Sequence, residues 1–195
     1  RFEHSIGTMQ LCSEMFFNSV SNSSDKTLKP FYKIYEKAIA DVIADINTNK
    51  EYEGILKKAI KGIPDIQLDN FQSALIPDNV PSDYRMVHEI LIQSIRAAAL
   101  LHDIGHPPYS HVVERAMKAA YKNAKADTDR RVSYQNIMKK YVDEGRPLHE
   151  VMGDEVSRSI LKGILTQTVE ENKNRNTDAG AKEITFETII LEIVL

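Results

Sequence analysis

The sequence predicts an all-α, mainly helical fold, and three observations support that prediction. Apolar residues recur at three-to-four spacing in several segments, which is the pattern of helices packed on a core. Strand signals are scarce, and neither a repeat nor a heptad run is evident. At 195 residues, 42% of them hydrophobic and 27% charged, the chain suits one domain with a single sizeable core.

The N-terminal quarter is expected to hold two helices. Residues 5–17 carry apolar side chains at helical spacing, which would place His4 at or near the start of the first helix. Residues 18–25 are rich in Ser and Asn and indicate a loop. Pro30 suits the first turn of a second helix, whose apolar stripe ends near Asn47.

The next part of the chain leads into a long helix. Residues 51–61 predict a short helix with a basic face, and residues 65–81 look irregular. Ser82 and Asp83 provide a cap for the long helix, which runs through Leu101 to the pair His102 and Asp103.

The C-terminal half is expected to continue as helices. One should start after Pro108 and continue to about Ala126, and another should carry His149. Residues 170–182 are polar and unpatterned, which is typical of a solvated or disordered loop. The last dozen residues fit a helix or a strand equally well.

Composition and charge narrow the classes of function. A net charge of -3 and a pI near 6.1 argue against a nucleic-acid groove that covers the whole surface. The single cysteine, Cys12, has no internal partner for a disulfide, so the count fits a reducing compartment, and we expect the cytoplasm. No apolar run approaches the roughly 18 residues that a membrane span needs.

Residues 95–114, IRAAALLHDIGHPPYSHVVE, contain the densest group of chemically active side chains. His102, Asp103, His106 and His111 fall within ten positions, directly after an apolar run. Imidazole and carboxylate are ligand types that divalent cations select, and such sites keep positions open for water. The adjacent His102 and Asp103 are therefore a candidate half-site for a metal ion.

The glycine and prolines after this pair predict where the helix ends. Gly105 can take a left-handed helix cap at low cost, and Pro107 and Pro108 prevent simple continuation of the helix. His102 and Asp103 would then lie on the last helical turn, where both side chains can reach one ion beyond it.

The whole string, HDIGHPPYSHVVE, closely resembles the signature of the HD-domain metal-dependent phosphohydrolases, in particular the branch containing the deoxynucleoside triphosphate triphosphohydrolases. Residues 1–5, RFEHS, match the first motif of that branch, and residues 148–150, LHE, resemble its later His-Glu motif. The resemblance implies a single HD-domain helical bundle over residues 1–195, truncated at both ends. A helical insertion within residues 18–82 would separate the first two motifs.

The resemblance also implies a divalent metal ion, which could be Mn, Mg, Fe, Zn, Ni or Co. Carried over residue by residue, its ligands are His4, His102 and Asp103. The fourth ligand of the family is a distal aspartate, which we expect beyond Leu195. His88 lies outside every motif, about 21 Å from His102 along a helix, and so is too far away to bind the same ion.

Histidines at positions 106, 111 and 149 match those that line the substrate pocket of this branch. We expect His111 to act as the acid that protonates the leaving 5′ oxygen, with Glu114 one turn later to orient it. His106 and His149 would contact phosphate. The remaining expected substrate contacts are Arg1, as a bidentate phosphate clamp, and Tyr109, which is close to the motif.

The resemblance implies that the protein hydrolyses a deoxynucleoside triphosphate to the deoxynucleoside and inorganic triphosphate. One alternative is another nucleotide: a nucleoside monophosphate, a cyclic dinucleotide or a guanosine polyphosphate, because fold and ligands do not dictate the substrate. A second is a regulatory module whose metal site has decayed. Family members commonly self-assemble, so a homo-oligomer is expected by resemblance.

Overall fold

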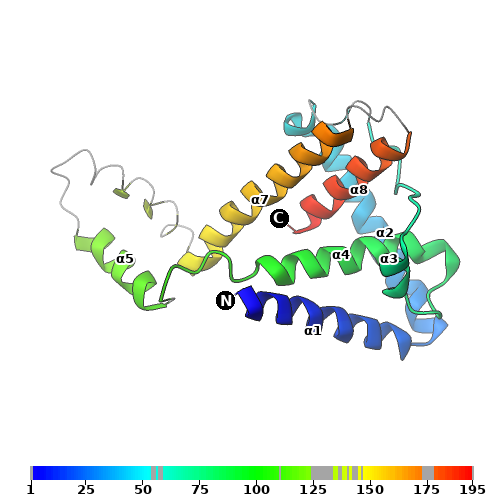
Figure 1. Ribbon diagram of the computed structural model, residues 1–195, viewed down its shortest axis with the longest axis horizontal. Helices are drawn as coiled ribbons and strands as arrows, with labels where there is room; N and C mark the ends of the chain where they lie inside the picture. Colours follow the sequence, from blue (N-terminus) through cyan, green and yellow to red (C-terminus); the bar gives the residue numbers. More distant parts are fainter. Residues whose placement is uncertain are drawn as a thin grey trace.

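The computed structural model describes residues 2–53, 56, 59–109, 111–123, 134–135, 138–139, 141, 145, 147–172 and 178–194. Regular structure within these ranges is helical throughout, which confirms the all-α prediction (Figure 1). Among the described residues, no helix is both long and apolar enough to cross a membrane. The helices are α1 (Phe2–Ser21), α2 (Asp25–Thr48), α3 (Asn70–Ala74), α4 (Arg85–Leu101), α5 (His111–Asn123), α7 (Leu148–Asn172) and α8 (Asp178–Val194), with 3₁₀ turns η1 (Lys50–Tyr52) and η2 (Ser82–Tyr84).

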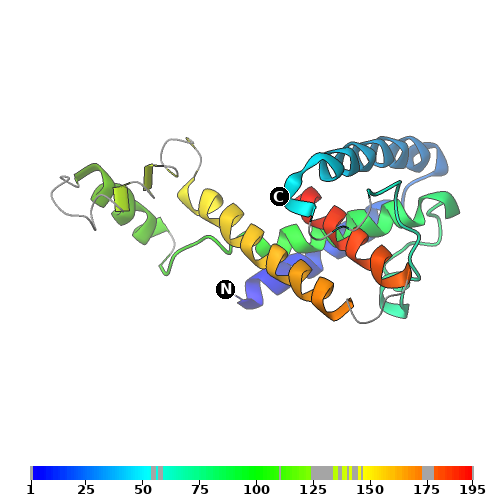
Figure 2. The same cartoon turned by 90° about the horizontal axis from the view of Figure 1, so that it is seen from above.

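Helix α4 lies at the centre of the molecule. It packs against α1, α2 and α8, and α7 packs in turn on α8 (Figures 1 and 2). Its first half is buried on nearly every side, which is the pattern of a helix surrounded by others rather than of a surface helix. The buried α4 residues are Val87, His88, Glu89, Ile90, Leu91, Ile92, Ser94, Ala99 and Leu101.

His88 is part of this core. Its ring is fully buried, its Nδ1 lies 2.8 Å from the hydroxyl of Tyr32, and its Nε2 lies 3.0 Å from the carbonyl oxygen of Leu75. The ring also stacks on Phe16, with centroids 5.2 Å apart. Burial lowers the pKa of His88. His88 is therefore a satisfied structural histidine that joins α1, α2 and α4.

The boundary between the first two helices differs from the prediction. Helix α1 continues to Ser21, and α2 already begins at Asp25, so Pro30 lies inside α2 rather than in its first turn. The reason is packing, because Val20 and Leu28 are both buried in the core and extend the two helices toward each other.

The predicted helix over residues 51–61 is wrong for the residues described there. Only the short η1 turn forms, and the Asn47 side chain then bonds both backbone groups of Ile60, donating to its oxygen at 2.9 Å and accepting from its nitrogen at 2.7 Å. These bonds hold Ile60 in a non-helical segment. Helix α3, inside the segment expected to be irregular, begins with a capping box between Asp69 and Gln72.

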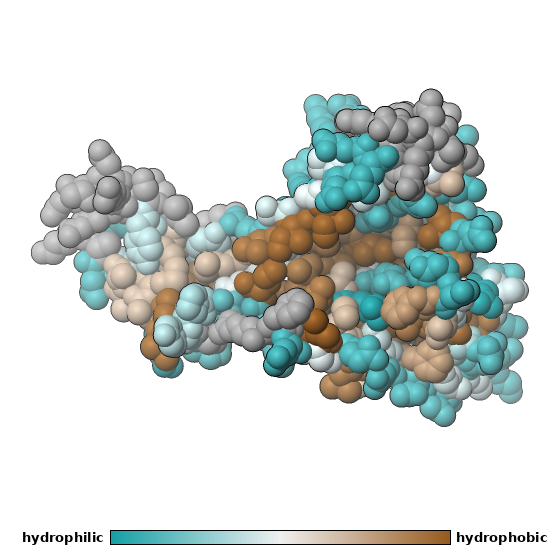
Figure 3. Space-filling view, in the orientation of Figure 1, coloured by the Kyte–Doolittle hydropathy of each residue, from teal (hydrophilic) through white to brown (hydrophobic). Residues whose placement is uncertain are grey.

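The C-terminal segments are more helical than the sequence predicted. Helix α7 continues to Asn172, into the expected polar loop, and the ambiguous final residues form α8. Leu165 and Ile189, from α7 and α8, are buried in the same core cluster. Val156, Ile160 and Ile164 of α7 are exposed. Figure 3 shows apolar side chains gathered near the centre of the face in view.

One end of the molecule gathers the segments that carry the motifs. The N-terminus of α1, the C-terminal end of α4 and the C-terminus of α8 lie toward the same side in both ribbon views, and α5 lies beyond them, apart from the α1, α4 and α8 body (Figures 1 and 2). Glu114 is the one buried residue of α5, so this helix contributes little to the core.

Candidate metal centre

The turn after α4 presents the His-Asp pair. The helix ends at Leu101, one residue before His102, so the pair begins this turn rather than closing the helix. Gly105 does not have a positive φ, and the predicted left-handed cap is therefore wrong. Glycine is required there for another reason: an added Cβ would lie 2.0 Å from the carbonyl oxygen of His149 and 2.2 Å from the nitrogen of Gly153. The turn thus lies directly on the first turns of α7.

Three side chains converge at the first cluster, which consists of His4, His102 and Asp103. Oδ2 of Asp103 lies 3.4 Å from Nε2 of His4 and 3.5 Å from Nε2 of His102. One ligand atom from each residue falls within 4.8 Å of the others. Ligand atoms around one tetrahedral zinc ion, at about 2.1 Å from it, lie about 3.4 Å apart. The first cluster therefore has the spacing and the donor types that fit a divalent cation.

The tautomer of His102 also suits metal binding. Its Nδ1 lies 2.7 Å from the carbonyl oxygen of Ala99, which can only accept a hydrogen bond, so Nδ1 carries the proton. The lone pair is then on Nε2, the atom that faces Asp103. A backbone carbonyl that fixes the ring in this way is the usual support of a histidine ligand.

Three more histidines form the second cluster, which consists of His106, His111 and His149. Their candidate ligand atoms also lie within 4.8 Å of one another, so this cluster too could hold a cation. The rings of His106 and His149 stack with centroids 3.9 Å apart. Nε2 of His106 lies 3.4 Å from Oδ1 of Asp103. The two oxygens of Asp103 therefore face different clusters, and the clusters are neighbours.

Glu114 accepts hydrogen bonds from two of the three histidines of the second cluster. Its Oε2 accepts from Nδ1 of His111 at 3.3 Å and from Nδ1 of His149 at 3.1 Å. Its Oε1 accepts from the backbone nitrogen of Leu148 and from Nζ of Lys118, both at 3.0 Å. The sequence predicted a contact with His111 alone.

These four hydrogen bonds decide the charge of Glu114. Burial by itself would raise the pKa of the carboxyl, but the bonds from Lys118, His149, His111 and the Leu148 backbone outweigh burial and lower the pKa to about 2. Glu114 is therefore ionised at neutral pH. Because a carboxylate only accepts, the two imidazoles present Nδ1–H to it and keep Nε2 for a ligand.

The structure describes only one of the remaining predicted substrate contacts, Tyr109. Tyr109 is 85% exposed and has a left-handed backbone, with φ of 62°. Arg1, the predicted phosphate clamp, lies outside the described residues. The expected distal aspartate, beyond Leu195, stays a prediction.

Comparison with known proteins identifies the domain. The family model for the HD domain matches residues 84–194, more than half of the chain. This chain belongs to the HD domain family. HD domains are generally metal-dependent hydrolases, and the family supports a metal-dependent phosphohydrolase here. No curated protein and no solved structure matches the chain.

The part of the chain that matches the HD domain model includes Asp103 and all three residues of the second cluster, whereas His4 lies outside it. The structure places His4 beside Asp103, which follows it by 99 positions in the sequence. The roles assigned to the individual residues stay predictions, as do the helical insertion, the homo-oligomer and the cytoplasmic location. Sequence reasoning missed Lys118, although its position four residues after Glu114 on one helix was a usable signal.

Proposed function

We propose that this HD domain hydrolyses deoxynucleoside triphosphates to the deoxynucleoside and inorganic triphosphate. The observation that supports the proposal most is the shared carboxylate of Asp103, which faces His4 and His102 with one oxygen and His106 with the other. A candidate cation site is thereby adjacent to a cluster of imidazoles. Such a cluster suits a chain of phosphates whose charge must be neutralised.

The first cluster would hold the divalent cation. A cation bound there supplies Lewis-acid polarisation of a phosphoryl oxygen and lowers the pKa of bound water. His4, His102 and Asp103 contribute one negative charge between them, which leaves most of the charge of a divalent cation for the substrate. The orientation of His102 by the Ala99 carbonyl means that little rearrangement is needed for its Nε2 to bind.

The second cluster would handle the phosphates and the leaving group. Water adds to the α-phosphorus and loses a proton to solvent, the bond from phosphorus to the 5′ oxygen breaks, and the 5′ oxygen takes a proton from Nε2 of His111. Glu114 stabilises the protonated His111 through Nδ1 and fixes its orientation. His106 and His149 would contact the phosphate chain, with Arg1 as an additional clamp.

Product analysis tests the proposal. The full-length protein is incubated with each of the four deoxynucleoside triphosphates and Mn²⁺ or Mg²⁺, and the products are separated by anion-exchange chromatography. We expect inorganic triphosphate and deoxynucleoside from the wild type, and at least a hundredfold less, on the order expected when a metal ligand is lost, from Asp103→Asn. Orthophosphate or pyrophosphate as the product would instead favour another nucleotide substrate. No product from any of the four substrates would refute the proposal.

A further inference from the structure

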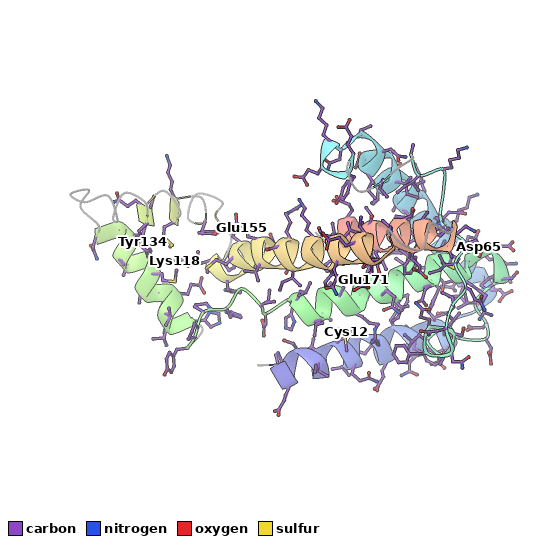
Figure 4. All side chains as sticks on the ribbon, turned by 45° about the horizontal axis from the view of Figure 1, so that its top comes forward. Cys12, Asp65, Lys118, Tyr134, Glu155 and Glu171 are labelled. Carbon is purple, nitrogen blue, oxygen red and sulfur yellow. The ribbon has the colours of Figure 1, made fainter. Side chains whose placement is uncertain are left out.

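Lys118 lies outside every motif, yet it contacts the centre of the site. It is on α5, one helical turn after Glu114, and its Nζ donates to Oε1 of that carboxylate at 3.0 Å. In Figure 4, Lys118 and Tyr134 both lie with α5, apart from the part of the molecule that holds Cys12 and Asp65. The Lys118 side chain is 39% exposed, whereas that of Glu114 is 8% exposed.

The bond differs from an ordinary surface ion pair because its acceptor is buried and fully used. A carboxylate offers about four lone-pair sites. All four have a donor in Glu114: the Leu148 backbone and Lys118 on Oε1, and the two imidazoles of His111 and His149 on Oε2. Loss of the Lys118 donor leaves Oε1 held by the Leu148 backbone alone, against two imidazoles on Oε2.

We propose that Lys118 is a positioning residue of this HD domain: it anchors Oε1 of Glu114 so that Oε2 alone serves His111 and His149. Lys118 would touch neither substrate nor cation, and would act through Glu114. Because it influences the proposed acid His111, the inference rests on the proposed function for its kinetic consequence. The structural consequence, which is the placement of Glu114, is independent of the proposed function.

The test compares three variants in the full-length protein. Lys118→Met removes the donor and the charge but keeps a good helix former, and Lys118→Arg keeps both. Lys122→Met is the matched control, because Lys122 is exposed and one further turn along the same helix. We expect Lys118→Met to lower kcat about tenfold and to leave KM within about twofold. Lys118→Arg should recover most of kcat, and Lys122→Met should match the wild type.

Three kinetic results would overturn the proposal: an unchanged kcat in Lys118→Met, an equal loss in Lys122→Met, or a rise in KM with kcat unchanged, which would mean a direct contact with substrate. An NMR measurement separates this proposal from the proposed function, since it needs no turnover. The ¹⁵N signals of Nδ1 in His111 and His149 should change in Lys118→Met and not in Lys122→Met. If no nucleotide is hydrolysed, this signature alone decides whether Lys118 positions Glu114, and unchanged signals would refute it.

Discussion

Glu114 shows how one buried carboxylate can set the chemistry of several neighbours. It joins α5 to the start of α7 through His149 and the Leu148 backbone, and it fixes two imidazoles in the same tautomer. Removal of this carboxylate is costly, because four donors then lose a shared, buried acceptor. The residue therefore links stability and activity.

The lowered pKa of Glu114 predicts a pH-dependent contribution to stability. The carboxyl has a pKa of about 2 when folded and an ordinary value of 4.5. A lowered folded pKa means that its contribution is complete above about pH 4.5 and is lost as the pH falls toward 2. We expect Glu114→Gln to lower the free energy of unfolding by about 3 kcal/mol at pH 7, with the difference from wild type shrinking below pH 4.5.

Urea unfolding at a series of pH values from 2.5 to 7 measures this difference. Glu170→Gln is the control, because Glu170 is an exposed residue of α7. Its difference from wild type should stay small and constant across the series. A Glu114→Gln difference that persists undiminished at pH 2.5 would contradict the assignment.

At the scale of elements, the contact between the turn after α4 and the start of α7 decides how the site is assembled. Gly105 has no room for a side chain against His149 and Gly153, so the turn that carries His102 and Asp103 is held against α7 by backbone packing. The first and second clusters are therefore fixed relative to each other by a contact that a single methyl group would break.

Gly105→Ala tests this contact. The added methyl group must displace the α7 backbone, and we expect a loss of about 1 to 3 kcal/mol in the free energy of unfolding, together with weaker Mn²⁺ binding. Urea unfolding and calorimetric titration measure the two effects. Gly163→Ala is the control on α7: nothing lies within 4 Å of its added Cβ, and alanine should stabilise that helix by up to about 1 kcal/mol. Equal behaviour of the two variants would refute the close-packing role.

Elements with strong periodicity were predictable, whereas those set by distant contacts were not. The helix that ends beside His102 followed from its apolar pattern, and α4 confirms it. The segment around Ile60 did not, because its backbone is held by Asn47, a contact that no local pattern encodes. The same holds for Gly105, where the sequence indicated that a glycine was needed but not which neighbour excludes a side chain.

Within the candidate site, the prediction that His4 lies near His102 and Asp103 came from the order of the motifs. No periodicity relates residues 98 positions apart. The contact between Glu114 and His149 was not predicted from the sequence. Both residues lay in recognised motifs, but their contact depends on how α5 meets α7.

At the scale of the whole molecule, the first cluster joins distant parts of the chain. His4 is on α1, and His102 and Asp103 follow α4, so a bound cation would close a loop of about a hundred residues. A ligand that binds only the folded state stabilises it by mass action, by about 2.7 kcal/mol at a hundredfold excess over Kd. Binding should therefore raise the melting temperature of the whole domain.

Thermal unfolding with Mn²⁺ and after chelation checks this expectation. For a chain of this size, we expect chelation to lower the Tm by about 5 to 10 °C. His4→Ala should lose most of that difference, because the cluster is left with two of its three described ligands. A His4→Ala variant with the same dependence on Mn²⁺ as the wild type would show that α1 does not contribute to the metal site.

The backbone at Tyr109 carries a final implication. A left-handed φ costs a residue with a Cβ about 1 to 2 kcal/mol, a penalty that glycine avoids, and an 85% exposed ring recovers almost none of it through burial. Folding alone thus favours glycine at this position. Replacement of Tyr109 by glycine is therefore expected to relieve this cost in the turn between α4 and α5.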